Sequence, residues 1–75
     1  MDAMPPTTLR KRSVLLSGHR TSVSVEDAFW QGLKEIAVRR GLSLNDLIAE
    51  VDADRSGSLS GAIRVFVLET LRGSG

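Results

Sequence analysis

The chain contains no cysteine and only three aromatic residues, which are Phe29, Trp30 and Phe66. The absence of cysteine excludes disulfide bridges, thiolate metal sites and a cysteine nucleophile. The chain is also short, with 75 residues, and a core of that size is only marginally stable without disulfides, a metal or an oligomeric partner. Because the composition supports neither disulfides nor a metal site, the short length itself indicates that the chain pairs with a second chain.

Long hydrophobic runs and a strong net charge are also missing. No apolar run approaches the roughly 18 residues of a membrane span, and the apolar stretch 14–16 is too short for a signal peptide, so we expect a soluble cytoplasmic protein. The net charge is +1, yet residues 1–25 carry four Lys/Arg and one Asp, whereas residues 26–75 carry six Lys/Arg and eight Asp/Glu. This basic front indicates a polyanionic partner on the N-terminal side.

Residues 1–10 contain Pro5-Pro6 and are predicted to form a flexible leader, followed by one domain over residues 11–72 and a frayed tail at 73–75. Arg10, Lys11 and Arg12 make a short basic arm. This arm either contacts phosphates or simply keeps the chain in solution.

A strand is predicted over residues 20–25, where Thr21, Val23 and Val25 alternate with polar residues. Gly18 interrupts the pattern as a bend, a bulge or the tip of a hairpin. The strand needs a partner for its backbone groups. Either residues 13–17 fold back on it, or it pairs with the same segment of a second chain; we favour the second arrangement because a two-fold pair is closed.

Three helices are predicted over about residues 26–40, 44–54 and 59–72. Ser24, Ser43 and Ser58 are the expected N-caps, and Gly41 is the expected C-terminal cap of the first helix. The third helix is apolar around most of its circumference, and one short chain has too little surface to cover it. The fold class is therefore mainly α with a short β ribbon, completed by a second copy of the chain.

This order of elements resembles the ribbon-helix-helix superfamily, and in particular a small bacterial group of ribbon-helix-helix domain proteins, here with an added third helix. The resemblance covers residues 11–72 and is carried by the segments Lys11–Val14, Gly18–Glu26, Ala28–Trp30, Leu33–Ala37, Arg40–Asn45, Leu47-Ile48 and Ala62–Leu68.

The resemblance implies an intertwined homodimer, or a tetramer through the third helix, that binds duplex DNA as a transcriptional regulator of the repressor type. Arg20, Ser22 and Ser24 would read bases in the major groove, although two serines are short for this task. Phosphate would be held by the N-terminus of the second helix together with the basic arm. The implied phosphate contacts are Arg10, Lys11, Arg12, Ser43, Leu44 and Asn45. The implied dimer interface contains Thr21, Val23, Val25, Phe29, Trp30, Leu33, Ile48 and Phe66.

Two other functions fit parts of the sequence. One is a homo-oligomeric protein-interaction module on the same scaffold without DNA binding. The other is calcium binding at residues 52–60, which match the first nine positions of an EF-hand loop but have Ile63 at the twelfth, where a glutamate is needed. No constellation of an enzyme is present, and His19, the only histidine, has no obvious metal-binding companions. We therefore expect no catalysis, cofactor or metal.

Overall fold

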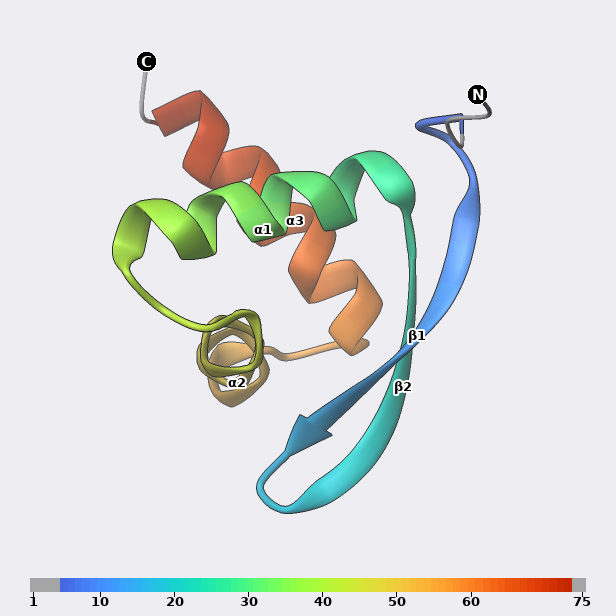
Figure 1. Ribbon diagram of the computed structural model, residues 1–75, viewed down its shortest axis with the longest axis vertical. Coiled ribbons are helices and arrows are strands. Elements are labelled where there is room, and N and C mark those ends of the chain that lie inside the picture. The colour runs from blue at the N-terminus through green and yellow to red at the C-terminus, as the bar shows by residue number, and fades with distance from the viewer. Residues whose placement is uncertain (1–4, 74–75) are drawn as a thin grey trace.

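The computed structural model describes residues 5–73, which form a β-hairpin followed by three helices. The strands are β1 (Leu9–Leu16) and β2 (His19–Glu26), and the helices are α1 (Asp27–Arg40), α2 (Leu44–Asp54) and α3 (Leu59–Gly73). Figure 1 shows the hairpin standing along one side of the helices, with its tip projecting past them. This confirms the predicted class, mainly helical with a short β ribbon. Within residues 5–73 no helix is long and apolar enough to cross a membrane.

The two strands pair with each other in the same chain. The antiparallel register runs from Leu16 opposite His19 to Leu9 opposite Glu26. Only Ser17 and Gly18 separate the strands, and both have positive φ, 51° and 79°. Two positive-φ residues in a two-residue loop suit the right-handed twist of a hairpin.

This pairing differs from the arrangement that we favoured. We predicted that residues 20–25 pair with a second chain, whereas the structure gives one edge of β2 to the chain's own β1. The tight turn at residues 17–18 is the physical reason, because it lets the chain reverse at once and fixes the register locally. Gly18 is therefore the tip of a hairpin, one of the three roles considered for it.

The start of α1 is stabilised by the segment that precedes the hairpin. The backbone N–H groups of Asp27 and Ala28 donate to the carbonyls of Thr8 and Pro6, at 2.8 and 3.0 Å. The N-cap residue is Glu26, whose side chain makes no capping bond. The prediction of Ser24 as N-cap was therefore wrong, because backbone carbonyls of the leader accept the helix's first donors.

The segment predicted as a flexible leader is divided by the structure. Leu9 and Arg10 belong to β1, and the preceding residues 5–8 contact α1 through the two bonds just given. The predictions for residues 1–4 and 74–75 lie outside the described part of the chain.

The other helix ends follow the predicted local signals. Gly41 ends α1 in the left-handed conformation with φ 68°. The Ser43 Oγ accepts from the Asp46 N–H, and the Ser58 Oγ accepts from the Gly61 N–H, both at 3.0 Å. These bonds confirm the predicted caps, since a serine hydroxyl satisfies a donor that has no partner inside the helix.

The core lies between the inner face of the hairpin and all three helices. Its fully buried side chains come from every layer, and they include Val25, Leu33, Ile48 and Ile63. At Gly32 in α1 the packing against α3 is very close, because a Cβ there would lie 2.8 Å from Val67 Cγ1.

Helix α3 is only partly covered by the rest of the chain. Among its residues only Ile63 and Val67 are buried. Val65, Leu68 and Leu71 remain 55%, 50% and 43% exposed. The prediction that one chain cannot cover this helix is confirmed.

Candidate nucleic-acid interface

The hairpin has an apolar inner face and a polar outer face. Alternate residues of a strand point to opposite faces, and Val14, Val23 and Val25 are buried on the inner one. The outer side chains that are exposed towards the tip will be called the outer ribbon face; they are Lys11, Ser13, Leu15, Arg20 and Ser22. Both strands contribute, because Ser13 lies opposite Ser22 and Leu15 opposite Arg20.

Positive charge dominates the hairpin. Residues 9–25 include no aspartate or glutamate. Among the cationic side chains, Arg10, Lys11 and Arg20 are exposed. Lys11 and Arg20 lie on the outer ribbon face, where their positive charge favours a polyanionic partner.

Arg12 has a different environment from the rest of the predicted basic arm. Its guanidinium donates to the Asp27 Oδ1 at 3.2 Å and lies 4.6 Å from the centre of the Trp30 ring. The side chain points inward with Val14, so it supports the junction between hairpin and α1. Within the predicted basic arm, Lys11 is thus exposed on the outer ribbon face, whereas Arg10, although exposed, lies on the same strand face as Arg12.

The base of β2, far from the hairpin tip, is covered by α3. Ser24 is half-buried, and its N–H donates to the Ser60 Oγ at 3.2 Å. The Glu26 carboxylate accepts two bonds from the Arg64 guanidinium, at 2.7 and 3.2 Å. Hydrogen bonding to Arg64 lowers the pKa of Glu26 below its usual value of 4.5.

Among the three predicted base readers, Arg20 and Ser22 are thus exposed, whereas Ser24 is partly covered. Sequence reasoning missed Ser13, which lies beside Ser22 on the same face. The two-residue loop at 17–18 was the signal that could have found it, because it fixes which residues of the two strands are opposite each other.

The N-terminus of α2 lies beside the outer ribbon face. The Asn45 side-chain amide donates to the Leu15 carbonyl at 3.0 Å and so joins α2 to the edge of β1. Leu44 and Asn45 are the first two residues of α2, and N–H groups at these positions have no acceptor within the helix. They carry the positive end of the helix dipole, which favours an anion.

The two predicted parts of the site meet at a shallow hollow of about 340 Å³. Its lining residues are Ser13, Val14, Leu15, Arg20 and Asn45. A side chain from the ribbon and one from the N-terminus of α2, 25 positions apart in sequence, therefore face the same space.

The predicted dimer-interface residues fall into two groups. Val23, Val25, Trp30, Leu33 and Ile48 are buried inside one chain. Thr21, Phe29 and Phe66 are half-buried. In this arrangement only the second group presents surface that another chain can contact.

The structure does not assemble residues 52–60 as a calcium loop. Asp52 and Asp54 lie within α2, where positions two apart point about 200° away from each other. The Asp52 carboxylate is bonded to Arg55 Nε at 2.6 Å, and Ser58 caps α3. Over residues 5–73 no group of three or more His, Cys, Asp or Glu side chains could hold a metal ion.

The fold is a two-stranded ribbon followed by capped helices, and the outer face of the ribbon is polar and exposed. Comparison of the chain with known protein families identifies the class to which this fold belongs. The family model described as "Ribbon-helix-helix domain" matches residues 9–71, and the chain belongs to this family. Ribbon-helix-helix domains typically form dimers, and they generally bind DNA as regulators of transcription.

Among solved structures, the chain is similar to an uncharacterized protein from Bordetella pertussis Tohama I. The two are 29% identical and superpose with a TM-score of 0.75. The match covers 93% of this chain and 62% of that protein, so this chain spans less than two thirds of its length. None of the curated proteins matches the chain.

Proposed function

We propose that this protein binds duplex DNA with its outer ribbon face in the major groove and regulates transcription. One observation carries the proposal: Arg20 of the ribbon and Asn45 at the N-terminus of α2 line the same hollow. A two-stranded ribbon fits the major groove, and a helix N-terminus beside it is placed to hold a backbone phosphate.

Each exposed group in this region has a distinct proposed role. Arg20 is the longest side chain on the outer ribbon face, and arginine can bond both acceptor atoms of a guanine. Ser13 and Ser22 are short, so they permit close approach of the ribbon while discriminating weakly between bases. Lys11, which lies on this face, contacts phosphate and provides affinity that does not depend on sequence.

Phosphate binding at α2 involves Ser43, Leu44 and Asn45. The Ser43 hydroxyl already caps the helix, so the proposed donors are the backbone N–H groups of Leu44 and Asn45. The bond from Asn45 to Leu15 holds these donors at a fixed position relative to the ribbon. The ribbon and the phosphate site would therefore meet DNA as one rigid surface.

The proposed DNA-binding form is a homodimer, as is typical of the family. Leu16 and His19 are opposite each other across the two-residue loop. In an antiparallel ladder the residues whose backbone groups point away from the partner strand alternate, so the backbone groups of Leu15, Ser13 and Lys11 point away from β2. The bond from Asn45 to the Leu15 carbonyl agrees with this direction. Strand pairing between two chains would have to use such an outer edge, since the inner edges of β1 and β2 are occupied by each other.

The test is a fluorescence-anisotropy titration with labelled duplex DNA at two salt concentrations. We expect binding that weakens steeply with salt, because phosphate contacts release counterions. Arg20→Ala should weaken binding by about 10- to 100-fold. Arg39→Ala, which removes an exposed arginine from the last turn of α1, is the matched control and should change affinity by less than about twofold.

Absence of binding at low salt by a folded, dimeric protein would contradict the proposal. The protein would then be better described as a protein-interaction module on the same scaffold. Circular dichroism of each variant separates loss of binding from loss of folding.

A further inference from the structure

The side of α3 that faces away from the core carries a seam with an apolar centre and an arginine at its C-terminal end. Gly61, Val65, Leu68 and Arg72 recur at the spacing i, i+4, i+7, i+11, which places them along one line of a helix. Val65 and Leu68, at the centre of this α3 seam, are each about half exposed. The spacing is that of a helix that packs lengthwise against another helix.

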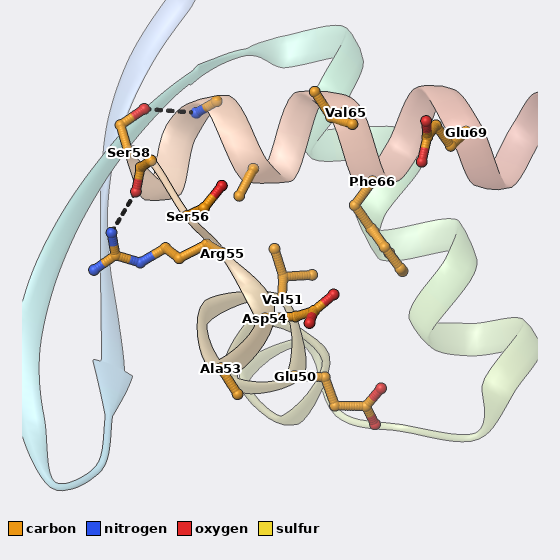
Figure 2. Close-up of a pocket in the computed structure, with 13 residues that line it drawn as sticks. Glu50, Val51, Ala53, Asp54, Arg55, Ser56, Ser58, Val65, Phe66 and Glu69 are labelled. Atoms are coloured by element: carbon orange, nitrogen blue, oxygen red, sulfur yellow. Dashed lines mark hydrogen bonds between the residues drawn. The ribbon is translucent and has the colours of Figure 1, made fainter.

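A groove of about 790 Å³ runs beside the α3 seam, between the end of α2, the loop at 55–58 and α3. Val51, Ala62 and Phe66 provide apolar lining, and Gly61 and Val65 belong to both the groove and the seam. Figure 2 shows Val51 from α2 and Phe66 from α3 facing the same space.

The acidic groups around the groove differ in whether they are paired. Glu50 bonds to Arg40 at 2.9 Å, and Arg55 is held by Asp52. Among residues 5–73, neither Asp54 nor Glu69 has an ion-pair partner. The groove therefore combines apolar lining with uncompensated negative charge, which suits an apolar surface that carries a cation.

We propose that the α3 seam binds the α3 seam of a second copy of this chain, with the two helices antiparallel about a two-fold axis. In that arrangement Val65 faces the partner's Leu68, and Gly61 faces the partner's Arg72. Such a contact is self-complementary and closes as a pair.

Charge decides between an antiparallel and a parallel pair. In a parallel pair the two Arg72 side chains would lie next to each other, which is unfavourable for like charges. In the antiparallel pair each Arg72 crosses the partner's Gly61, which has no side chain, and reaches the groove that contains the unpaired Asp54. The antiparallel pair also places the two helix dipoles in opposition.

No residue of the hairpin belongs to the α3 seam, so this interface would be additional to a dimer formed through the ribbons. A protein that uses both would assemble as a tetramer. A protein that used only the α3 seam would be a dimer with its two hairpins free.

Sedimentation velocity over a range of protein concentrations tests the proposal. Leu68→Glu places two charges at the centre of the paired seams and should lower the mass of the assembly about twofold. Val38→Glu is the control, because Val38 is 79% exposed on α1 and outside the seam. It should sediment as the wild type does.

A charge exchange makes the test specific to the antiparallel arrangement. Arg72→Glu alone should weaken association by about tenfold or more, and the double variant Arg72→Glu with Asp54→Arg should recover most of that loss. A folded Leu68→Glu variant with the mass of the wild type, or no recovery in the double variant, would overturn the proposal. A wild-type chain that stays monomeric at about 100 μM would do the same. DNA titrations of the same variants keep this question separate from DNA binding.

Discussion

Two neighbouring basic side chains in β1 have opposite environments. Arg12 lies two residues before Val14 in the strand, so its side chain points to the same, inner face and lies over Trp30. The side chain of Lys11 points to the opposite face and is exposed on the outer ribbon face. From the sequence we grouped residues 10–12 as one basic arm. Because β1 begins at Leu9, the alternation of side chains along a strand places Lys11 on one face and Arg12 on the other.

Gly32 supports a close contact between α1 and α3, and Gly32→Ala should be destabilising. A Cβ at this position would lie 2.8 Å from Val67 Cγ1, and a β-branched side chain in a helix has little freedom to move away. Overpacking costs about 1–3 kcal/mol, whereas replacing glycine by alanine gains about 1 kcal/mol of helix propensity. We expect a net loss of about 1 kcal/mol in a urea titration.

The same substitution in a Val67→Ala background gives the control. With the Cγ1 atom removed, the added methyl group has room, and Gly32→Ala should no longer destabilise. An unchanged penalty in that background would show that contact with Val67 is not the cause.

Glu26 links the stability of the fold to pH. Because Arg64 lowers the pKa of the folded-state carboxyl below 4.5, the unfolded chain takes up a proton at higher pH than the folded chain does. The stabilisation is therefore fully present above about pH 4.5 and is lost as the pH falls through the lower, folded-state pKa. Chemical denaturation at several pH values should show a smaller decrease on acidification for Glu26→Gln than for the wild type.

Glu35→Gln, at an exposed site on α1, controls for the general loss of a negative charge. It should follow the wild-type pH dependence. Equal pH profiles for Glu26→Gln and the wild type would contradict a role for the ion pair with Arg64.

At the scale of elements, the helices could be predicted better than the ribbon. The bounds of α2 follow from the serine cap at Ser43 and the breaker cluster after Asp54, which are local signals. Strand pairing does not follow from such local signals. The alternation over residues 20–25 predicts a strand, but this strand could pair with residues 13–17 of the same chain or with a second copy of the chain. The start of α1 was predicted to within one residue, but its N-cap was not, because the acceptors of its first N–H groups, the carbonyls of Pro6 and Thr8, lie about 20 positions earlier.

The hairpin turn can be tested separately from the strands. Gly18 has φ 79° with open space around its Cα, so Gly18→Ala should cost about 1 kcal/mol through backbone strain alone. Gly57→Ala also adds a methyl group into open space but has no positive φ, so it should be neutral or slightly stabilising. Thermal denaturation distinguishes the two; equal melting temperatures would contradict the conformational argument.

At the scale of the whole molecule, three contacts between distant segments create the candidate site. Asn45 bonds to Leu15, Ser60 to Ser24, and Arg64 to Glu26. These contacts bring the N-terminus of α2 to one edge of the hairpin and cover the base of the other strand. Spacing in the sequence predicts none of them, because the residues of each pair are 30 or more positions apart and lie on different elements.

The molecule also has two surfaces of different chemistry. The outer ribbon face is cationic and polar, whereas the α3 seam is apolar and lies beside unpaired carboxylates. We propose that the first surface binds DNA and that the second surface binds a second copy of the chain.

An NMR titration of the labelled protein with a short DNA duplex at low salt tests DNA binding by the outer ribbon face most directly. We predict that amide shift changes concentrate at residues 11–22 and at Leu44 and Asn45, and that they shrink as salt is added. Shift changes confined to α3 and the groove beside it, or none at all at low salt, would contradict DNA binding by this face.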